Sequence, residues 1–395
     1  MTSTAGATPK TIPSQTDWSA IAAQYDVSRA VIQLENGNFG TMARPVYAAY
    51  QGHLERINRN GSYYARREAG ADLMAVRANA AAVLGVSPDE IIFTRGATES
   101  LQVLIAGYDR LRAGDSVLTA DLDYDSMLAA FHGLEQRRGA KLISIALPEP
   151  ASFQALIDAY EAALKANPSI RLMLLTHVSH RTGLVLPVKE IVAMARSHDV
   201  DVIVDAAHSW GQLDFKLDDL GADFVGLTCH KWIGAPLGVG IAYIRRTRLD
   251  AIGLYFGEQG EGIDHRIHTG TTNFAATLSV AEALTFHNEI GAAAKEARLR
   301  GLRNRWAEAL RGHHGLEILT PSDPRLTCGI TSFRLTGKTT DAENRAIAQE
   351  LLQRFNIFTV ERSGVAKGAC VRVTPALFTS EAEIDALIVA LKAMA

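Results

Sequence analysis

The sequence has little cysteine, little excess of charge of either sign and no long apolar run. Its 395 residues include three cysteines, Cys229, Cys328 and Cys370, which are odd in number and far apart. This pattern fits a reducing compartment and supports neither a disulfide framework nor a zinc site, so we predict no metal. The 40 Lys and Arg residues against 43 Asp and Glu residues leave a formal net charge of −3. Without a basic surface or tail, we expect no nucleic-acid partner and no anionic membrane surface.

Targeting and membrane signals are also missing. The N-terminus shows no charged region followed by an apolar stretch, and no apolar run approaches the roughly 18 residues of a membrane span. Hydrophobic residues make up 47% of the chain and charged residues 21%, the ordinary balance of a globular protein. A chain of this length can bury a large core without disulfides or a structural metal. We therefore expect a soluble, cytoplasmic protein.

From residue 76 onward, short β-branched runs alternate with helical periodicity, which predicts an α/β domain with a mostly parallel sheet. The connection between the strand ending near Thr228 and the strand at 239–244 has only about ten residues, too few for a crossover helix, so that last strand should be antiparallel. The other predicted strands lie at 91–94, 117–119, 142–147, 171–176, 202–204 and 224–227.

We divide the chain into three parts. Residues 1–40 form an N-terminal arm and a loop, of which the polar first 15 or so are a loose arm. Residues 41–285 form a large domain, which ends in a helix at 275–289. Residues 286–395 form a small α+β domain that begins with a helix at 292–311. Its strands are expected near 329–335, 357–360 and 370–374, and its other helices at 341–355 and 380–393.

A glycine turn leads from the strand at 91–94 into the next helix. In the run Gly96-Ala97-Thr98, free backbone N–H groups, a Thr hydroxyl and the positive helix end come together. Such a combination suits a bound phosphate. The alternative is an ordinary capped helix with Thr98 as its N-cap.

Chemically capable side chains also follow two later strands. Asp205 follows the strand at 202–204, and its carboxylate could hold a ring nitrogen protonated or merely cap the next turn. His208, three residues later, could be a core histidine. Lys231 comes after the strand at 224–227, beside His230, and a lysine in such a setting can become a nucleophilic amine. Arg372, on a strand of the small domain, could bind a carboxylate in two hydrogen bonds or lie on an exposed edge.

Each of these signals is weak, but together they are the parts that hold pyridoxal phosphate. The lysine forms the Schiff base, the aspartate keeps the ring nitrogen protonated, and the helix end takes the phosphate. At these residues the chain resembles the class V aminotransferase family of fold-type-I pyridoxal-phosphate enzymes, from around residue 30 to its end. Within that family it is most similar to isopenicillin N epimerase-like proteins, and more loosely to cysteine desulfurases.

The resemblance implies a role for each matching position. The residues it assigns to the cofactor are Lys231 as the Schiff-base lysine; Gly96, Ala97, Thr98, Thr228 and His230 at the phosphate; Asp205 at the ring nitrogen; His208 near the 3-hydroxyl; and Tyr124 stacked on the ring. Thr271, in a Gly-Thr pair, is expected to reach the phosphate of the neighbouring subunit of a homodimer. On the substrate side, Arg372 binds the α-carboxylate, Asn38 lies in a glycine-rich loop, and His180 replaces an asparagine of the desulfurases.

The expected activity is chemistry at Cα of an amino acid or an amino-acid-derived substrate, with epimerisation or racemisation preferred. Lys231 would serve one face of the substrate, and Tyr124, His208 or His180 the other. The first alternative is an aminotransferase, followed by a cysteine desulfurase or C–S lyase. Cys370 argues against the desulfurase, because it lies two residues before Arg372 on the same face of a strand and not on a mobile loop. A cofactor-binding sensor without catalysis is the non-enzymatic alternative.

Overall fold

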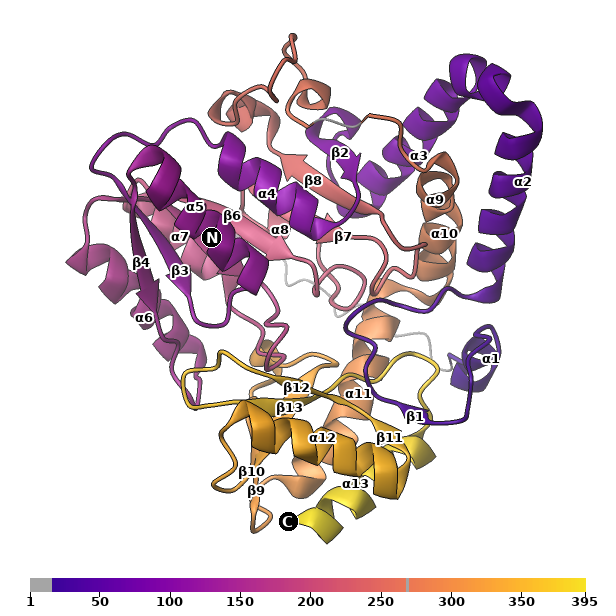
Figure 1. The fold of residues 1–395 in the computed structure, drawn as a ribbon, viewed down its shortest axis with the longest axis vertical. Helices are drawn as coiled ribbons and strands as arrows, with labels where there is room; N and C mark the ends of the chain where they lie inside the picture. The colour runs from indigo at the N-terminus through magenta and orange to yellow at the C-terminus, as the bar shows by residue number, and fades with distance from the viewer. Residues whose placement is uncertain (1–15, 268–269) are drawn as a thin grey trace, which may run out of the picture.

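A seven-stranded sheet forms the centre of the larger part of the molecule. The computed structural model describes residues 16–267 and 270–395, so the arm expected over the first 15 residues falls outside the described residues (Figure 1). The strand order is β2-β8-β7-β6-β5-β3-β4. β8 runs antiparallel to both of its neighbours, and all the other pairs are parallel, which confirms the expected topology. The strands are β2 (Ile91–Thr94), β3 (Ser116–Ala120), β4 (Lys141–Ile145), β5 (Ile170–Thr176), β6 (Asp201–Ala206), β7 (Phe224–Thr228) and β8 (Gly240–Ile244).

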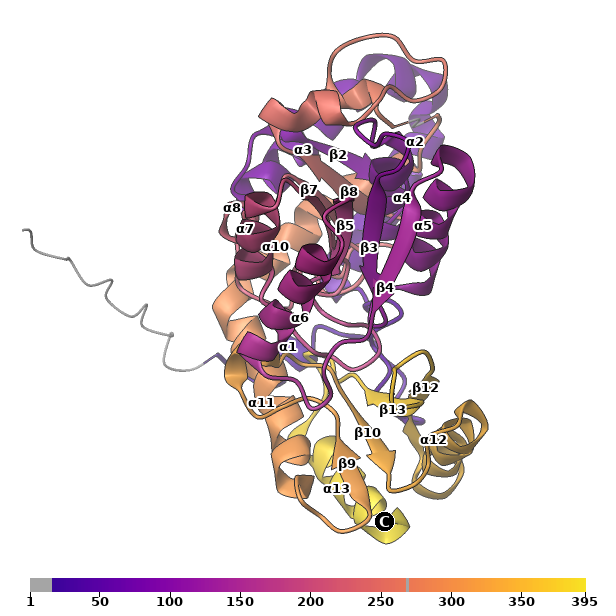
Figure 2. The ribbon, with the colours of Figure 1, turned by 90° about the vertical axis from the view of Figure 1, so that its left-hand side faces the viewer.

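Helices cover both faces of this sheet. Figure 2 shows the sheet nearly edge-on between α4 and α5 on one side and α7, α8 and α10 on the other. Each face has its own core: Leu104 and Phe131 pack against strand residues such as Leu174, whereas Tyr160 and Ile191 belong to the core of the opposite face. The helices are α4 (Ala97–Gly107), α5 (Asp125–Arg138), α6 (Phe153–Ala166), α7 (Val188–Ser197), α8 (Leu217–Leu220) and α10 (Val280–Ile290).

Three helices near the N-terminus were not expected from the sequence: α1 (Trp18–Ala22), α2 (Arg44–Arg67) and α3 (Ala69–Leu84). The long α2 is interrupted at Gly61, where the backbone leaves helical geometry, and its buried residues are only Val46 and Tyr64. A helix with so few buried positions carries little apolar periodicity. The single helix expected at 275–289 is also wrong: it is two helices, α9 (Phe274–Leu278) and α10, separated at Ser279.

A second, antiparallel sheet has the order β12-β13-β10-β9 and packs with three helices in the lower part of Figure 1. Its strands are β9 (Leu316–Ile318), β10 (Thr331–Leu335), β12 (Val360–Arg362) and β13 (Cys370–Val373), and its helices are α11 (Ala292–Leu310), α12 (Asp341–Phe355) and α13 (Glu381–Met394). The N-terminal strand β1 (Ile32–Gln33) pairs in parallel with β11 (Ile357–Phe358). Residues more than 300 positions apart in sequence are therefore neighbours here.

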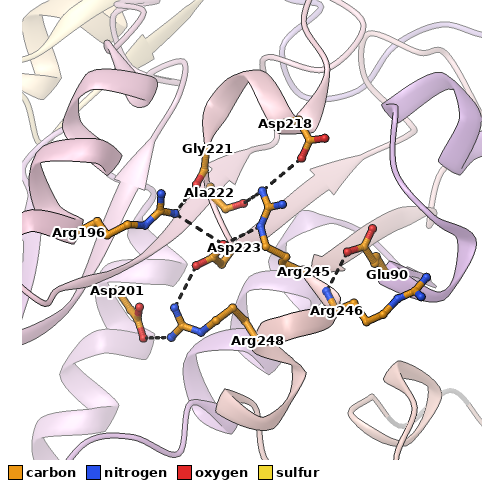
Figure 3. Close-up of polar contacts among 10 residues, drawn as sticks. All are labelled: Glu90, Arg196, Asp201, Asp218, Gly221, Ala222, Asp223, Arg245, Arg246 and Arg248. Atoms are coloured by element: carbon orange, nitrogen blue, oxygen red, sulfur yellow. Dashed lines mark hydrogen bonds and ion pairs between the residues drawn. The ribbon is translucent and has the colours of Figure 1, made fainter.

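Charged side chains hold together the ends of the strands that lie away from the cavity described below (Figure 3). Asp223, just before β7, accepts hydrogen bonds from Arg245 Nε at 2.8 Å and Arg248 Nη1 at 3.0 Å. Arg248 also donates to Asp201, the first residue of β6, at 2.6 Å. These contacts join the starts of β6 and β7, and the pairing of the two strands places Asp205 opposite Gly226 toward their other ends. In the described part of the chain, no helix is long and apolar enough to cross a membrane.

Candidate active site

A cavity of about 780 Å³ lies at the carboxyl ends of β5, β6 and β7, the place where open α/β sheets bind ligands. It brings together every predicted site residue except Thr271. The predicted residues that line it are Asn38, Gly96, Ala97, Thr98, Tyr124, His180, Asp205, His208, Thr228, His230, Lys231 and Arg372. Thr271 is exposed on the surface of the single chain. Its expected role in a neighbouring subunit's site is neither supported nor opposed by its position.

The N-terminus of α4 forms one end of the cavity. Gly96 is the N-cap and no side chain caps the helix, so the alternative in which Thr98 is the N-cap is wrong. The Ala97 N–H donates to Thr228 Oγ1 at 3.3 Å, and Thr98 lines the cavity. The imidazole of His230 is held by the Val239 carbonyl at 2.9 Å. A helix start with free N–H groups and nearby hydroxyls fits a phosphate group.

The next wall of the cavity holds a buried carboxylate. Asp205, the fifth residue of β6, is 5% exposed, and its Oδ1 accepts a hydrogen bond from the Ala207 N–H at 2.9 Å. Burial raises the pKa of Asp205, while the Ala207 N–H and the charge of Lys231 act in the opposite direction. A buried carboxylate is stable only with a partner. A protonated ring nitrogen of a bound cofactor would provide that partner.

Lys231 and His208 form a direct contact at the centre of the cavity. Lys231 Nζ lies 2.9 Å from His208 Nε2. Burial lowers the pKa of Lys231 to about 8, opposed by the nearby Asp205 carboxylate. Burial and the charge of Lys231 also hold the pKa of His208 well below its usual range, so the imidazole is neutral. His208 Nδ1 is buried without a hydrogen-bond partner in the described part of the chain, leaving it available to a bound group.

The pKa of Lys231 near 8 leads to a testable pH dependence. A neutral amine reacts as a nucleophile and an ammonium does not, so a lowered pKa raises reactivity at neutral pH. We expect acylation of Lys231 in the cofactor-free protein to rise with pH to a half-maximum near 8, and to fall away below it. Mass spectrometry of the peptide that contains Lys231 gives the rate at each pH. A half-maximum near the ordinary lysine pKa of about 10.4 would contradict this prediction.

Tyr124 and His180 form another wall. Tyr124 lies at the start of α5, after β3, and His180 follows β5. Their rings meet edge to face, with centroids 5.0 Å apart and an interplanar angle of 88°. Burial and neighbouring arginines hold the pKa of His180 well below its usual range. The His180 carbonyl accepts a hydrogen bond from Arg372 Nη1 at 2.6 Å, which links this wall to β13.

The glycine-rich N-terminal loop closes over the lysine. The Gly40 N–H donates to the His230 carbonyl at 2.8 Å. A Cβ at position 40 would overlap the Lys231 carbonyl oxygen, so only glycine allows this approach. Asn38, in the same loop, is exposed and borders the cavity.

Three residues near the cavity were missed from the sequence. Glu35 contacts Arg372, and Arg362 on β12 lines the cavity beside it. Arg181, whose side chain is 3% exposed, donates to Asp125 Oδ1 at 2.5 Å and to the Ser363 carbonyl. These contacts join segments more than 50 residues apart, and no local motif marks them. The one available signal was that Glu35 directly precedes the glycine-rich loop.

Comparisons with known proteins agree with this site. The sequence model of the family Aminotransferase class-V matches residues 41–387. The chain is 29% identical to an isopenicillin N epimerase from Streptomyces clavuligerus over 96% of its own length and 98% of that protein. It is 25% identical to a probable cysteine desulfurase from Vibrio cholerae, over 94% of this chain and 97% of that protein.

The solved structures show the same fold. A cysteine desulfurase from Escherichia coli superposes with a TM-score of 0.80 at 20% identity, covering 96% of this chain and 98% of that one. The family match spans most of the chain, and the cavity holds a helix start for a phosphate, a buried carboxylate and a buried amine. The chain therefore belongs to the class V aminotransferase family and is a pyridoxal-phosphate-dependent enzyme.

Proposed function

We propose that this enzyme epimerises or racemises an amino acid, or an amino-acid-derived substrate, at Cα. In this proposal Arg372 holds the α-carboxylate, Lys231 moves the proton on one face of Cα, and Tyr124 acts on the other. Pyridoxal phosphate, when bound, supplies the electron sink that makes the Cα proton acidic. Inversion then needs one proton-transfer group on each face.

The observation that carries this proposal is the separation of Lys231 from Tyr124. Lys231 follows β7 and Tyr124 follows β3, and β5 and β6 lie between those two strands in the sheet. Three strand spacings of about 4.8 Å therefore separate the strands that precede the two residues. In this proposal, a ring held at Asp205 on β6 would lie between the two side chains. His208 lies on the lysine side, because its Nε2 contacts Lys231 Nζ. We therefore assign the second face to Tyr124, with His180 packed against its ring.

The cysteines support a reaction without a protein thiol. Cys370 is fully buried on β13, and burial raises the pKa of its thiol to about 11. A thiol in that state is a poor nucleophile, because the thiolate is the reactive form. Matches to an isopenicillin N epimerase and to a cysteine desulfurase both span nearly the whole chain, and the identity is 29% to the first and 25% to the second, a small difference in the direction of inversion. The buried, unpaired cysteines support a cytoplasmic location as well.

A panel of L- and D-amino acids tests the function. We expect the holoenzyme, without any keto acid, to convert one enantiomer of a preferred amino acid into the other, as measured by chiral chromatography. Tyr124→Phe should slow this interconversion by at least about a hundredfold, because it removes the hydroxyl but keeps the ring. If no amino acid is inverted, and addition of a keto acid instead produces a new amino acid, the enzyme is an aminotransferase and the proposal is wrong.

We further propose a homodimer in which Thr271 completes the partner's phosphate site. Large apolar side chains are exposed on the single chain, among them Tyr63, Met74 and Phe256, the last 98% exposed. Exposed apolar side chains that are gathered into one patch are typical of protein interfaces, and a dimer would cover them. Thr271 is exposed as well, as a residue that serves another subunit would be.

Subunit mixing tests the dimer. Lys231→Ala and Thr271→Ala subunits should each be weakly active or inactive alone. In an equal mixture, half of the dimers are hybrids with one intact site, so about a quarter of wild-type activity should return. Subunit exchange is checked by mass spectrometry of differently tagged chains. An exchanged mixture that recovers no activity, or a fully active monomer, would contradict a shared site.

A further inference from the structure

Arg372 is part of a buried three-residue charge cluster with Glu35 and Arg362. Arg372 Nη2 lies 2.5 Å from Glu35 Oε1 and 2.8 Å from Oε2. Arg362 Nη2 reaches the same Oε1 at 3.4 Å. The side chains of Arg372 and Glu35 are only 2% and 5% exposed. One buried carboxylate is therefore shared by two guanidinium groups, the buried one of Arg372 and that of Arg362, whose side chain is 28% exposed.

The backbone fixes this cluster. Glu35 forms a parallel bridge with Thr374, whose N–H donates to the Leu34 carbonyl at 2.8 Å, so Glu35 lies beside the end of β13. β12 pairs antiparallel with β13, with Arg362 opposite Cys370. Cys370 and Arg372 are two residues apart on a strand and face the same side, so Arg362 and Arg372 are diagonal neighbours. The contact of both arginines with Glu35 follows from strand register.

The guanidinium of Arg372 is also fixed from two other directions. Its Nη1 donates to the His180 carbonyl at 2.6 Å. The Gly37 backbone lies against its plane, where a Cβ would come within 2.6 Å of Nη2. Arg372 Nε has no partner in the described part of the chain. These contacts hold the guanidinium of Arg372 in one orientation at the cavity wall.

The charges of the cluster sum to +1. Arg362 and Arg372 both line the cavity, whereas Glu35 is not among the lining residues and contacts them from behind. Burial and the neighbouring Arg372 lower the pKa of Arg362 to about 10, so Arg362 still carries its charge at neutral pH. Buried charges are stable when they are compensated. One incoming carboxylate brings the cluster to neutrality, and a second would leave an uncompensated negative charge.

We propose that Glu35 determines specificity by making this wall a site for a single carboxylate. Glu35 contacts both arginines and leaves one excess positive charge. The α-carboxylate at Arg372 neutralises that charge, and a second carboxylate close to Cα is disfavoured. This proposal rests on the proposed function only in taking Arg372 as the residue that binds the substrate carboxylate. It places no restriction on a carboxylate at the far end of a long side chain.

Binding of propionate and succinate to the holoenzyme tests the proposal without turnover. Their dissociation constants are measured by calorimetry and by the change in cofactor absorbance. Glu35→Gln raises the cluster charge to +2, so succinate should gain about tenfold more affinity than propionate. Glu35→Asp keeps the charge and should preserve the wild-type ratio. The double variant Glu35→Gln/Arg362→Gln restores the charge of +1, and it should return the ratio to the wild-type value.

Two controls separate the possible failures. Glu361→Gln removes the same charge from the cavity wall, but Glu361 pairs with Arg345 at 3.0 Å instead of Arg372, so its effect on the ratio should be much smaller. Arg372→Leu should abolish propionate binding. If Arg372→Leu binds propionate normally, the assignment of the substrate-carboxylate site is wrong. Suppose instead that Arg372→Leu loses propionate binding. The role of Glu35 is then refuted if Glu35→Gln leaves the ratio of succinate affinity to propionate affinity unchanged, or changes it no more than Glu361→Gln does.

Discussion

Replacing Lys231 with alanine should abolish covalent attachment of the cofactor and lower turnover by at least about a thousandfold. Only a primary amine can form that bond, and Lys231 is the buried amine whose pKa is lowered to about 8 in the cavity. The fold should survive, because the group that Lys231 Nζ contacts directly is the neutral imidazole of His208, and the nearby Asp205 keeps its hydrogen bond from the Ala207 N–H. Borohydride reduction followed by peptide mass spectrometry detects the attachment site.

Lys231→Arg is the matched control for this prediction. It keeps the positive charge beside Asp205 and His208 but cannot form the covalent bond, so it should be as inactive as Lys231→Ala. If arginine restored turnover, charge and not nucleophilicity would be the contribution of Lys231. A reducible lysine adduct and full activity in Lys231→Ala would mean that another lysine carries the cofactor.

Replacing Asp205 with asparagine should have the second largest effect. The variant keeps the shape of the side chain, and its amide oxygen can still accept the hydrogen bond that the Ala207 N–H donates to Asp205 Oδ1 at 2.9 Å. It loses the charge that we assign to keeping the ring nitrogen of the cofactor protonated, and we expect turnover to fall by about a hundredfold or more, with weaker cofactor binding. Titration of the cofactor-free protein gives the affinity, and steady-state kinetics gives kcat.

The stability of the same variant should change in the opposite direction. Asp205 is buried, and burial raises its pKa, so its charge is costly in the absence of the cofactor. The cofactor-free Asp205→Asn protein should therefore be at least as stable as the wild type, as measured by Tm. Asp205→Glu, which keeps the charge, should retain more activity than Asp205→Asn. Wild-type kcat in Asp205→Asn would contradict the electron-sink role.

The parts of the site that follow strand ends could be predicted from the sequence. Asp205 directly follows a β-branched run and Lys231 lies three residues beyond the apolar strand β7, and the carboxyl ends of parallel strands meet at one edge of the sheet. The short connection after β7 also predicted an antiparallel β8 correctly. In each case the information lies within a few consecutive residues, where periodicity and loop length are readable.

The cluster around Arg372 could not be predicted in this way. Glu35 and Arg372 are 337 positions apart, and their contact depends on the parallel bridge between Glu35 and Thr374. The two-residue strands β1 and β11 that precede this bridge are too short to show alternation. α2 was missed for a related reason, because only Val46 and Tyr64 are buried along it. Contacts made by tertiary structure alone leave no local pattern.

The most direct test of the account follows hydrogen at Cα. The holoenzyme is incubated in deuterated water with a single enantiomer of the amino acid that the panel identifies, and without a keto acid. Proton NMR and chiral chromatography then report deuterium and configuration together. The inverted enantiomer should appear with deuterium at Cα, because its new proton comes from a solvent-exchangeable group such as Tyr124. Inversion without deuterium, or release of a keto acid or sulfide in place of the other enantiomer, would contradict it.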